Sequence, residues 1–359
     1  MHAASWPGSP RPLSWFNALA GTTFLSKDPA RQNRRIRPAA LSAVSNGMTI
    51  TVHTHSVFGH REDDLRISVI IPTYNRPKAV ARCLEALSRI RAPEGGFEVI
   101  VVNDGGIPPP DAAVLACREG TPVRVRVLDQ ANRGPAAARN AGADAASGTI
   151  LAFTDDDCVP RADWLAALDD ALLSNSEALV GGHTVNVLTD NPYSAASQAL
   201  AEFVMAYFDG GARGRFFTSN NVAMAKERFL ELGGFDSSFP SAAGEDRDLC
   251  DRWSAEGWPS VRVPEAVVDH EHALSPRTFV RQHFNYGRGG RVFRKVRVER
   301  GRPVLLDPGF YLASVRHGYR WPRSRGGLVA ALTIAAHGAY AGGMAYELLR
   351  GTVRAKALA

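Results

Sequence analysis

The sequence predicts an α/β protein with a doubly wound, mostly parallel sheet that is flanked by helices and followed by a C-terminal helical extension. Two observations support this fold class. Strand-like and amphipathic helix-like segments alternate four times within about 110 residues from Arg66 onward, which favours right-handed β-α-β units. Most of the strand-like segments are continuously apolar, as is typical of parallel strands that are buried on both faces.

The first two expected strands are residues 67–72 and 97–102, and each is a continuous apolar run. Between them, Pro77 is suited to the first turn of a helix. The apolar residues after it recur at helical spacing and fall on one face, namely Val80, Cys83, Leu84, Leu87 and Ile90. The sequence therefore predicts a strand, an amphipathic helix and a second buried strand in succession.

The third expected strand, residues 123–127, alternates strictly between valine and arginine. We therefore place it at an edge of the sheet, with one face in water. An Ala-rich helix over 134–146 and a buried strand over 150–154 should follow, and then an amphipathic helix that carries Trp164, Leu165, Leu168 and Leu172. Residues 178–187 and 261–268 have the character of further strands.

Residues 1–65 lack sustained periodicity and are rich in Pro, Ser, Gly and Asn, so we expect a largely disordered N-terminal extension. No convincing charged segment precedes the short apolar patch at 13–25, which argues against a cleaved signal peptide. Met48 is a candidate start of translation, because the character of the sequence changes after it. The four cysteines are scattered without a CxxC pair, which fits a reducing compartment and indicates neither a zinc site nor a disulfide framework.

Residues 276–359 form an expected basic helical extension. Thirteen Arg or Lys residues and two acids lie between residues 277 and 325, which indicates a surface that attracts the phosphates of lipid head groups or of nucleic acid. Residues 326–349 carry one formally charged side chain, Glu347, and are long enough to span a bilayer. Their glycines and polar residues favour a helix that lies in the membrane interface, with a packing helix as the alternative.

An acidic run, Asp155-Asp156-Asp157, follows directly after the expected strand 150–154. Side chains alternate along an extended chain, so Asp155 and Asp157 are predicted to share one face and Asp156 to occupy the other. Two carboxylates on one face suit a hard divalent cation such as Mg²⁺ or Mn²⁺, with substrate phosphates completing the coordination. The alternative is an acidic loop that only caps the following helix.

Two other expected strands also end in polar residues. The segment 73–76 follows the first strand and 103–105 follows the second. Ligands of doubly wound sheets bind beyond the carboxyl ends of the strands. All three polar strand ends should therefore open onto the same edge of the sheet, and the sequence predicts a binding site there.

These strand ends, with further motifs in the same order and spacing, resemble the family 2 glycosyltransferases. The matching segments are 69–76, 102–105, 132–140 and 153–157 on the nucleotide-sugar side, with 233–236 and 244–246 on the acceptor side. The resemblance implies a GT-A fold over residues 66–275, divided into a nucleotide-sugar half (66–160) and an acceptor half (161–275). It also implies transfer of a sugar from a nucleoside diphosphate sugar with inversion.

The resemblance assigns roles on the donor side. Thr73 and Asp104 would hold the base and ribose, and Arg133 would lie over the nucleotide. Asp155 and Asp157 match the DxD motif of the family, with Asp157 as a direct metal ligand and Asp155 near the ribose or the metal. The residues expected to bind the nucleotide sugar are Pro72, Thr73, Tyr74, Arg76, Asp104, Arg133, Asp155 and Asp156.

Further roles follow from the resemblance on the other side of the expected cleft. His270 is expected to join Asp157 and Asp155 at a Mg²⁺ or Mn²⁺ ion, and His272 would share its face in an extended segment. Asp246 matches the position of the general base, with Glu245 as the second candidate. Arg139 could contact the diphosphate or fix a neighbouring carboxylate, and we favour the second role.

The resulting expectation is an inverting glycosyltransferase that moves one sugar onto a glycan or lipid-linked acceptor in cell-envelope synthesis. The QxxRW motif of processive members is missing, which favours single-sugar transfer. We expect a cytoplasmic protein, peripheral or monotopic on the anionic inner face of the cell membrane, and no nucleic-acid partner. Two alternatives remain: a metal-dependent nucleotidyltransferase, and a membrane-binding protein with an inactive transferase core.

Overall fold

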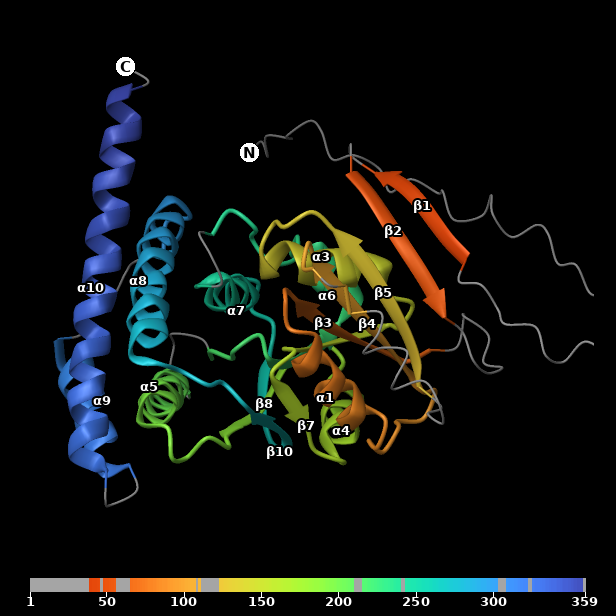
Figure 1. Ribbon diagram of the computed structural model, residues 1–359, viewed down its shortest axis with the longest axis horizontal. Coiled ribbons are helices and arrows are strands. Elements are labelled where there is room, and N and C mark those ends of the chain that lie inside the picture. Colours follow the sequence, from red (N-terminus) through yellow and green to blue (C-terminus); the bar gives the residue numbers. More distant parts are fainter. Residues whose placement is uncertain are drawn as a thin grey trace, which may run out of the picture. The chain divides into compact units, whose positions relative to one another are not determined.

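The computed structural model describes residues 39–45, 48–55, 65–107, 109–110, 123–209, 215–239, 243–302, 308–321 and 325–357 (Figure 1). Within these residues one sheet of ten strands runs through the protein in the order β1-β2-β5-β4-β3-β6-β9-β8-β10-β7. The strands are β1 (Ala39–Ser45), β2 (Met48–His55), β3 (Ile67–Thr73), β4 (Phe97–Asp104), β5 (Arg124–Gln130), β6 (Ile150–Thr154), β7 (Cys158–Pro160), β8 (Leu179–Asn186), β9 (Asn221–Ala225) and β10 (Ser260–His270).

The centre of the sheet is parallel, as the sequence predicts. β5, β4, β3 and β6 pair in parallel in that order, and β8 and β10 form a second parallel pair. β9 is antiparallel to both β6 and β8 and joins the two parallel groups. The predicted α/β fold with a mostly parallel, helix-flanked sheet is therefore confirmed.

Helices cover both faces of this sheet. The helices of the core are α1 (Pro77–Leu87), α3 (Pro135–Ala145), α4 (Trp164–Ser174), α6 (Lys226–Glu231) and α7 (Glu245–Ala255). Buried residues of α1 and α4, such as Leu84 and Leu165, pack on one face of the sheet. Buried residues of α3, α6 and α7, such as Ala138 and Phe229, pack on the other. Apolar area buried on both sides is what makes the central strands continuously hydrophobic.

The N-terminal side differs from the expectation in two respects. Residues 39–45 and 48–55 form strands, although we expected residues 1–65 to be largely disordered; residues 1–38 lie outside the described part of the chain. β2 pairs with β5, so the strand that we placed at the edge of the sheet has neighbours on both sides. The alternation of Thr, Ile and Val in 49–54 is the signal for a strand that we did not use.

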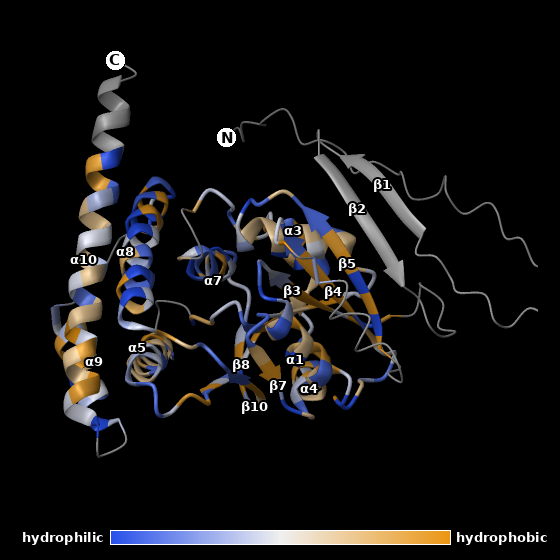
Figure 2. Ribbon diagram, in the orientation of Figure 1, coloured by the Kyte–Doolittle hydropathy of each residue, from blue (hydrophilic) through white to orange (hydrophobic). Residues whose placement is uncertain are grey.

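The remaining helices lie beside the sheet (Figure 1). They are α5 (Pro192–Phe208), α8 (Pro276–Glu299), α9 (Pro308–Arg320) and α10 (Gly326–Ala357). α10 packs against α8, α9 and α5. Figure 2 shows α10 as mostly hydrophobic and α8 as mostly hydrophilic. Within the described residues, α10 contains the one segment, Gly326–Arg350, that is long and apolar enough to cross a membrane by length and composition.

Helix α3 lies unusually close to the sheet at Gly142. A Cβ atom at this position would lie 2.5 Å from Cγ2 of Ile70 in β3 and 3.2 Å from Cγ2 of Val102 in β4. Both neighbours are fully buried β-branched residues and have little freedom to move aside. Glycine at this position therefore sets the distance between α3 and the strand ends that carry Thr73 and Asp104.

We expect Gly142→Ala to lower the free energy of unfolding by about 1–2 kcal/mol, because overpacking costs more than the helix propensity that alanine gains. Gly338→Ala is the matched control, since Gly338 is an exposed glycine inside α10 whose added Cβ has no neighbour within 4 Å. This control should raise stability slightly. Urea denaturation of both variants measures the effects, and equal behaviour of the two would contradict the close packing of α3.

Candidate active site

A cavity of about 1350 Å³ opens at the carboxyl ends of the central strands. Helices α5, α7, α8, α9 and α10 contribute the opposite walls. The predicted site residues that line this cavity are Pro72, Thr73, Tyr74, Arg76, Asp104, Asp155, Asp156, Asp157, Glu245, Asp246 and His270. Arg133 does not line it and has an exposed side chain. The three polar strand ends therefore open onto one cavity, as predicted, whereas Arg133, which we expected over the nucleotide, lies outside its lining.

The acidic run does not continue the extended conformation of β6, which ends at Thr154. A turn closed by the Cys158 N–H, which donates to the Asp155 carbonyl at 3.1 Å, separates β6 from β7. The predicted alternation of the three carboxylates between two faces is therefore wrong. Each carboxylate has its own set of partners instead, and these partners come from different elements.

Asp157 lies beside the two histidines at the end of β10. Its Oδ1 is 3.4 Å from Nε2 of His270, and its Oδ2 is 3.3 Å from Nδ1 of His272. The imidazole rings are stacked with centroids 5.0 Å apart. The other nitrogen of His272, Nε2, lies 2.6 Å from the Gln282 Oε1 in α8. The side chains of Asp157, His270 and His272 thus present three potential metal ligands, with Gln282 fixing the orientation of one imidazole.

This group fits a divalent cation. One ligand atom from each of Asp157, His270 and His272 lies within 4.8 Å of the other two. A carboxylate with two imidazoles suits Mn²⁺ better than Mg²⁺, because Mg²⁺ prefers oxygen ligands. Asp155, which we expected at the metal as well, does not belong to this group. His272, which we did not include among the predicted metal ligands, does belong to it.

The charges around Asp157 favour its ionised form. Burial alone would raise the pKa of Asp157, but hydrogen bonds with His270 and His272 and the charge of Arg76 hold it well below its ordinary value. Burial lowers the pKa of His272, but hydrogen bonds with Asp157 and Gln282 outweigh this effect and hold the pKa above its ordinary value. The carboxylate of Asp157 is therefore available as an anionic ligand throughout the neutral pH range.

Asp156 faces the end of β3. Its Oδ2 accepts a hydrogen bond of 2.7 Å from the Thr73 hydroxyl, and its Oδ1 accepts one of 3.0 Å from Arg76. The same Arg76 nitrogen also donates to Asp157 at 2.9 Å. Burial and the neighbouring Asp157 raise the pKa of Asp156 to about 6, against the opposing charge of Arg76. Asp156 therefore ties the first strand end to the acidic run.

Asp104 uses both carboxylate oxygens within the protein. Oδ1 accepts from the Gln130 side chain at 2.7 Å and from the Arg133 N–H at 2.8 Å, and Oδ2 accepts from the Gly134 N–H at 2.8 Å. Gly134 precedes α3 and has φ of 89°, a conformation that favours glycine. In this arrangement Asp104 holds the entry into α3, and its side chain lines the cavity at the same time.

Arg139 of α3 joins the acidic run to α7. Arg139 is 3% exposed, and its guanidinium donates to Oδ1 of Asp155 at 2.6 Å and to Oε1 of Glu245 at 3.5 Å. Its Nε and the second oxygen of Glu245 are buried and have no hydrogen-bond partner within the described chain. This geometry agrees with the structural role that we favoured for Arg139, because it positions two carboxylates rather than facing outward.

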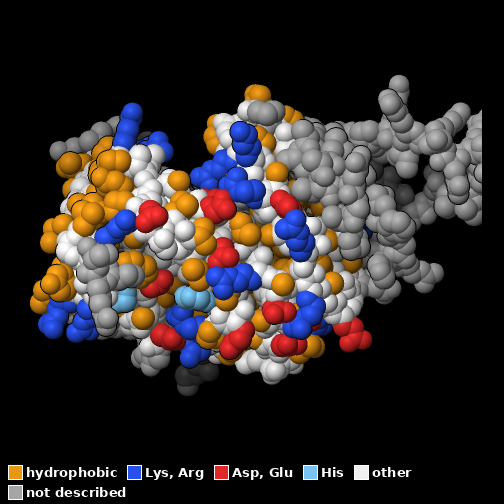
Figure 3. Space-filling view, turned by 60° about the horizontal axis from the view of Figure 1, so that its bottom comes forward, with side chains coloured by type: hydrophobic (Ala, Val, Ile, Leu, Met, Phe, Trp, Pro, Cys, Tyr) orange, Lys and Arg blue, Asp and Glu red, His pale blue; other side chains and the backbone are white. Residues whose placement is uncertain are grey.

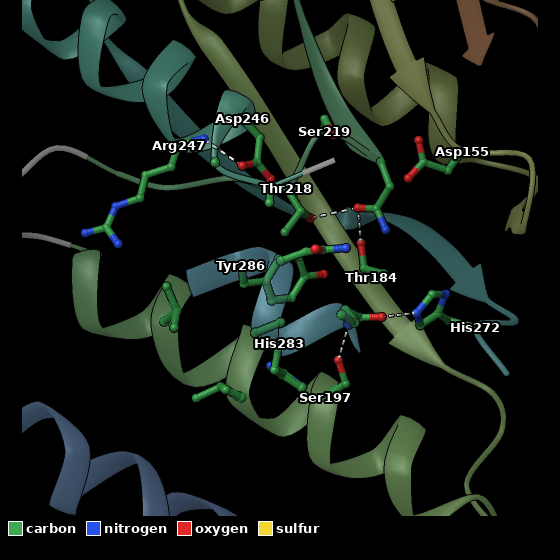
Figure 4. A pocket seen from close by; sticks show the side chains of 18 of the residues that line it. Asp155, Thr184, Ser197, Thr218, Ser219, Asp246, Arg247, His272, His283 and Tyr286 are labelled. Atoms are coloured by element: carbon green, nitrogen blue, oxygen red, sulfur yellow. Dashed lines mark hydrogen bonds between the residues drawn. The ribbon is translucent and has the colours of Figure 1, made fainter. Parts of the chain in front are cut away.

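Asp246 lies on the other side of the cavity, in the first turn of α7 (Figure 4). Its Oδ1 accepts a hydrogen bond of 2.7 Å from the Arg247 N–H. Burial raises the pKa of Asp246, and burial together with repulsion from Asp246 raises the pKa of Glu245. Of the two acids, Asp246 is only partly buried while Glu245 is 3% exposed, so Asp246 is the more accessible proton acceptor.

A polar wall between the two ends of the cavity was not predicted. The Asn220 Oδ1 accepts hydrogen bonds from Thr218 at 2.7 Å and Thr184 at 3.3 Å, and the Gln198 side chain donates to the Thr184 carbonyl at 2.7 Å. These residues come from β8, α5 and the turn before β9, which are far apart in the sequence. The polar run 218–221 is the one signal in the sequence that points to this wall.

Three comparisons place these features among known proteins. The profile of glycosyl transferase family 2 matches residues 68–230. The chain is 33% identical over 226 residues to glycosyltransferase AglE of Haloferax volcanii, an alignment that covers 62% of this chain and 72% of AglE. It is 28% identical over 258 residues to the pre-mycofactocin glycosyltransferase of Mycobacterium tuberculosis, covering 69% of this chain and 51% of that protein. The chain thus spans about half the length of this relative.

Among solved structures, a mannosyltransferase from Pyrobaculum calidifontis, in complex with GDP-Man and Mn²⁺, has a similar fold. The TM-score is 0.53 at 20% sequence identity, and the match covers 82% of this chain and 81% of that one. This likeness supports the GT-A-like fold alone. The match to AglE, which covers 72% of that protein, and the match to the family profile also show which family the chain belongs to. They confirm the resemblance based on the strand-end motifs: the chain belongs to glycosyl transferase family 2.

Proposed function

We propose that this protein transfers a single sugar from a nucleoside diphosphate sugar to an acceptor hydroxyl, with inversion at the anomeric carbon. One observation carries the proposal: a single cavity joins the Asp157–His270–His272 group at the strand ends to Asp246 in α7. The first group suits a cation bound to a diphosphate, and the second suits a general base. In inverting transfer the acceptor hydroxyl attacks one face of the sugar while the diphosphate leaves from the opposite face, so the two groups are suited to the two sides of this reaction.

On the donor side, Asp157, His270 and His272 would hold Mn²⁺, which would neutralise charge on the departing diphosphate. The similar mannosyltransferase structure contains Mn²⁺ together with GDP-Man, which is consistent with this assignment. Pro72 lies near the end of β3, and Tyr74 and Arg76 follow that strand. All three residues line the cavity, where a nucleotide would contact them. Asp155 is held by Arg139 at the edge of this region and would contact the ribose.

On the acceptor side, Asp246 would accept the proton of the attacking hydroxyl. Glu245 is the weaker candidate, because one of its oxygens already contacts Arg139 and the side chain is 3% exposed. The proton transfer needs an ionised Asp246, which Arg139 and the N–H groups of Arg247 and Ser219 favour against the effect of burial. Geometry and charge therefore favour the same residue.

The two alternatives are less well supported. A nucleotidyltransferase normally carries a Gly-rich phosphate loop after its first strand, and this position reads Pro72-Thr73-Tyr74-Asn75-Arg76. An inactive core would tolerate loss of site carboxylates, whereas Asp104, Asp157 and Asp246 all line the cavity. Family membership also favours sugar transfer over both alternatives.

We further propose a role at the inner face of the cell membrane, in cell-envelope glycan or glycolipid synthesis. Apolar side chains gather on the side formed by α9 and α10 (Figure 3), and several large ones there are exposed, including Leu312, Tyr319, Leu328, Ile334 and Leu349. Contiguous exposed apolar area of this kind is typical of a membrane or protein contact. The arginines of the preceding segment would favour an anionic lipid surface.

Asp246→Asn should lower kcat by about 10²–10⁴-fold, because the amide cannot accept the proton of the acceptor. Donor binding should persist, since Asp246 does not belong to the metal group. Steady-state kinetics with the matching donor and acceptor, together with titration calorimetry of the donor, separate the two effects. Near-normal turnover of this variant would exclude Asp246 as the base.

A panel of nucleoside diphosphate sugars should contain at least one that raises Tm by several degrees in the presence of Mn²⁺ and much less without it. Asp157→Asn should abolish the part of the shift that depends on Mn²⁺. Asp170→Asn is the control, because Asp170 is an exposed acid of α4 outside the cavity. A panel without any Mn²⁺-dependent shift would contradict the proposed donor site.

The pH profile of kcat/KM should fall on the acidic side with an apparent pKa above the ordinary aspartate value of 3.8, because the base must be deprotonated and its pKa is raised. Glu245→Gln should move this limb to lower pH, because the substitution removes the repulsion between Glu245 and Asp246. It also leaves Asp246 as the one carboxylate of this pair that interacts with the charge of Arg139. Measurements at saturating Mn²⁺ test both points. A limb that moves to higher pH in Glu245→Gln would contradict the proposed pairing.

A further inference from the structure

The side chain of Arg247 occupies an unusual position beside the candidate base. Its guanidinium carbon lies 4.5 Å from the ring centroid of Phe208, at the end of α5, and 4.8 Å from that of Phe293 in α8. It lines the cavity, and no carboxylate of the described residues forms an ion pair with it. Two aromatic rings stabilise the cation in surroundings where water is scarce, but they do not neutralise its charge.

A second arginine faces the same space. Arg294 of α8 lines the cavity near Arg247, and the described part of the chain offers it no ion pair either. The next arginine along the helix, Arg297, differs because it pairs with Asp251. Burial and repulsion from Arg294 lower the pKa of Arg247 below its ordinary value, although Tyr340 of α10 opposes this. The charge of Asp246 also acts on Arg247, but neither arginine forms an ion pair with a carboxylate of the described residues, so an anion that contacts both guanidinium groups would be favourable.

This place is separate from the expected diphosphate site. In Figure 4 the side chain of Arg247 extends away from Asp155 and His272, and Asp246 lies between Arg247 and these two residues. The rings and hydroxyl around Arg247 come from α5, α8 and α10, whereas the metal group comes from the strand ends. An anion bound at Arg247 would therefore belong to the acceptor and not to the nucleotide.

Aromatic contacts continue from Arg247 towards α9. Phe208, which contacts the guanidinium, packs against Tyr207, and Tyr207 packs against Phe310 of α9. The aliphatic side chains of Val204 and Met205 in α5 line the same cavity. A sugar ring can stack on an aromatic ring, but a free sugar or a soluble glycan would leave the aliphatic side chains without an apolar partner. A hydrocarbon chain attached to an anionic group would cover them and would also neutralise the arginines.

We propose that Arg247 and Arg294 form a subsite for the phosphate of an amphiphilic acceptor, whose hydrocarbon chain lies along α5 and α9 and whose acceptor hydroxyl reaches Asp246. This subsite rests on the proposed function and defines the class of acceptor that the enzyme uses. A guanidinium suits phosphate because it can donate two parallel hydrogen bonds. The arginines bind the acceptor and take no part in proton transfer.

The test measures binding of farnesyl phosphate to the full chain by titration calorimetry, with farnesol and inorganic phosphate as partial ligands. We expect farnesyl phosphate to bind most tightly and inorganic phosphate to compete with it. Arg247→Gln and Arg294→Gln should each weaken farnesyl phosphate binding by about tenfold or more, because each removes charge-assisted hydrogen bonds. Farnesol should bind weakly and equally to all variants.

Arg291→Gln is the matched control, because Arg291 is a half-buried arginine of α8 that does not line the cavity, and its affinity should match the wild type. Equal affinity of wild type and both subsite variants for farnesyl phosphate would overturn the proposal. Equal affinity of the wild type for inorganic and farnesyl phosphate would overturn its lipid part.

Two further measurements keep the test independent of folding and of the donor site. Arg247→Lys should retain part of the affinity, and Arg294→Gln reports on the same subsite if Arg247→Gln does not fold. The Mn²⁺-dependent thermal shift with a nucleoside diphosphate sugar should be unchanged in the arginine variants. If this shift is absent from every protein while the arginine-dependent binding remains, the proposed function fails and the subsite stands.

Discussion

The buried ion pairs of Arg139 connect the two sides of the cavity, and the remaining geometry depends on them. Arg139 lies on α3, Asp155 follows β6 and Glu245 begins α7, so one guanidinium fixes three elements that are distant in the sequence. An unpaired guanidinium at this depth would be strongly unfavourable, and so would either carboxylate alone. The position of Asp246 therefore follows from the position of the acidic run, because Glu245 is its neighbour in the same helical turn.

The same constraint explains how three consecutive aspartates are tolerated. Each carboxylate has a different partner: Asp155 contacts Arg139, Asp156 contacts Thr73, and Asp157 lies beside the histidines. Arg76 bridges the last two and reduces their mutual repulsion. The turn after Thr154 makes this division possible, since an extended chain would have directed Asp155 and Asp157 to one side. The turn gives each of the three carboxylates a separate partner, and the contacts with these partners in turn stabilise the conformation of the turn.

The sequence predicted what depends on local pattern and missed what depends on contacts between distant segments. Continuous apolar runs such as 67–72 define buried parallel strands, and their polar ends converge because of topology alone. The conformation of the acidic run was predicted wrongly. The strand ends at Thr154, but we assumed that side chains continue to alternate between two faces in the three aspartates that follow. The place of His272 in the metal group depends on Gln282 in α8, a contact that no local pattern reveals.

Arg247 shows how the electrostatics of the cavity extend beyond the predicted motifs. The acidic run gives the strand-end side a negative character that a cation would balance, whereas Arg247 and Arg294 give the helical side a positive character. Asp246 lies between these regions (Figure 4), so its ionisation responds to the occupants of both. A cation with its diphosphate on one side and an anionic acceptor on the other would each neutralise protein charge. The cavity is therefore electrostatically most favourable when both substrates are present, which is the state in which transfer occurs.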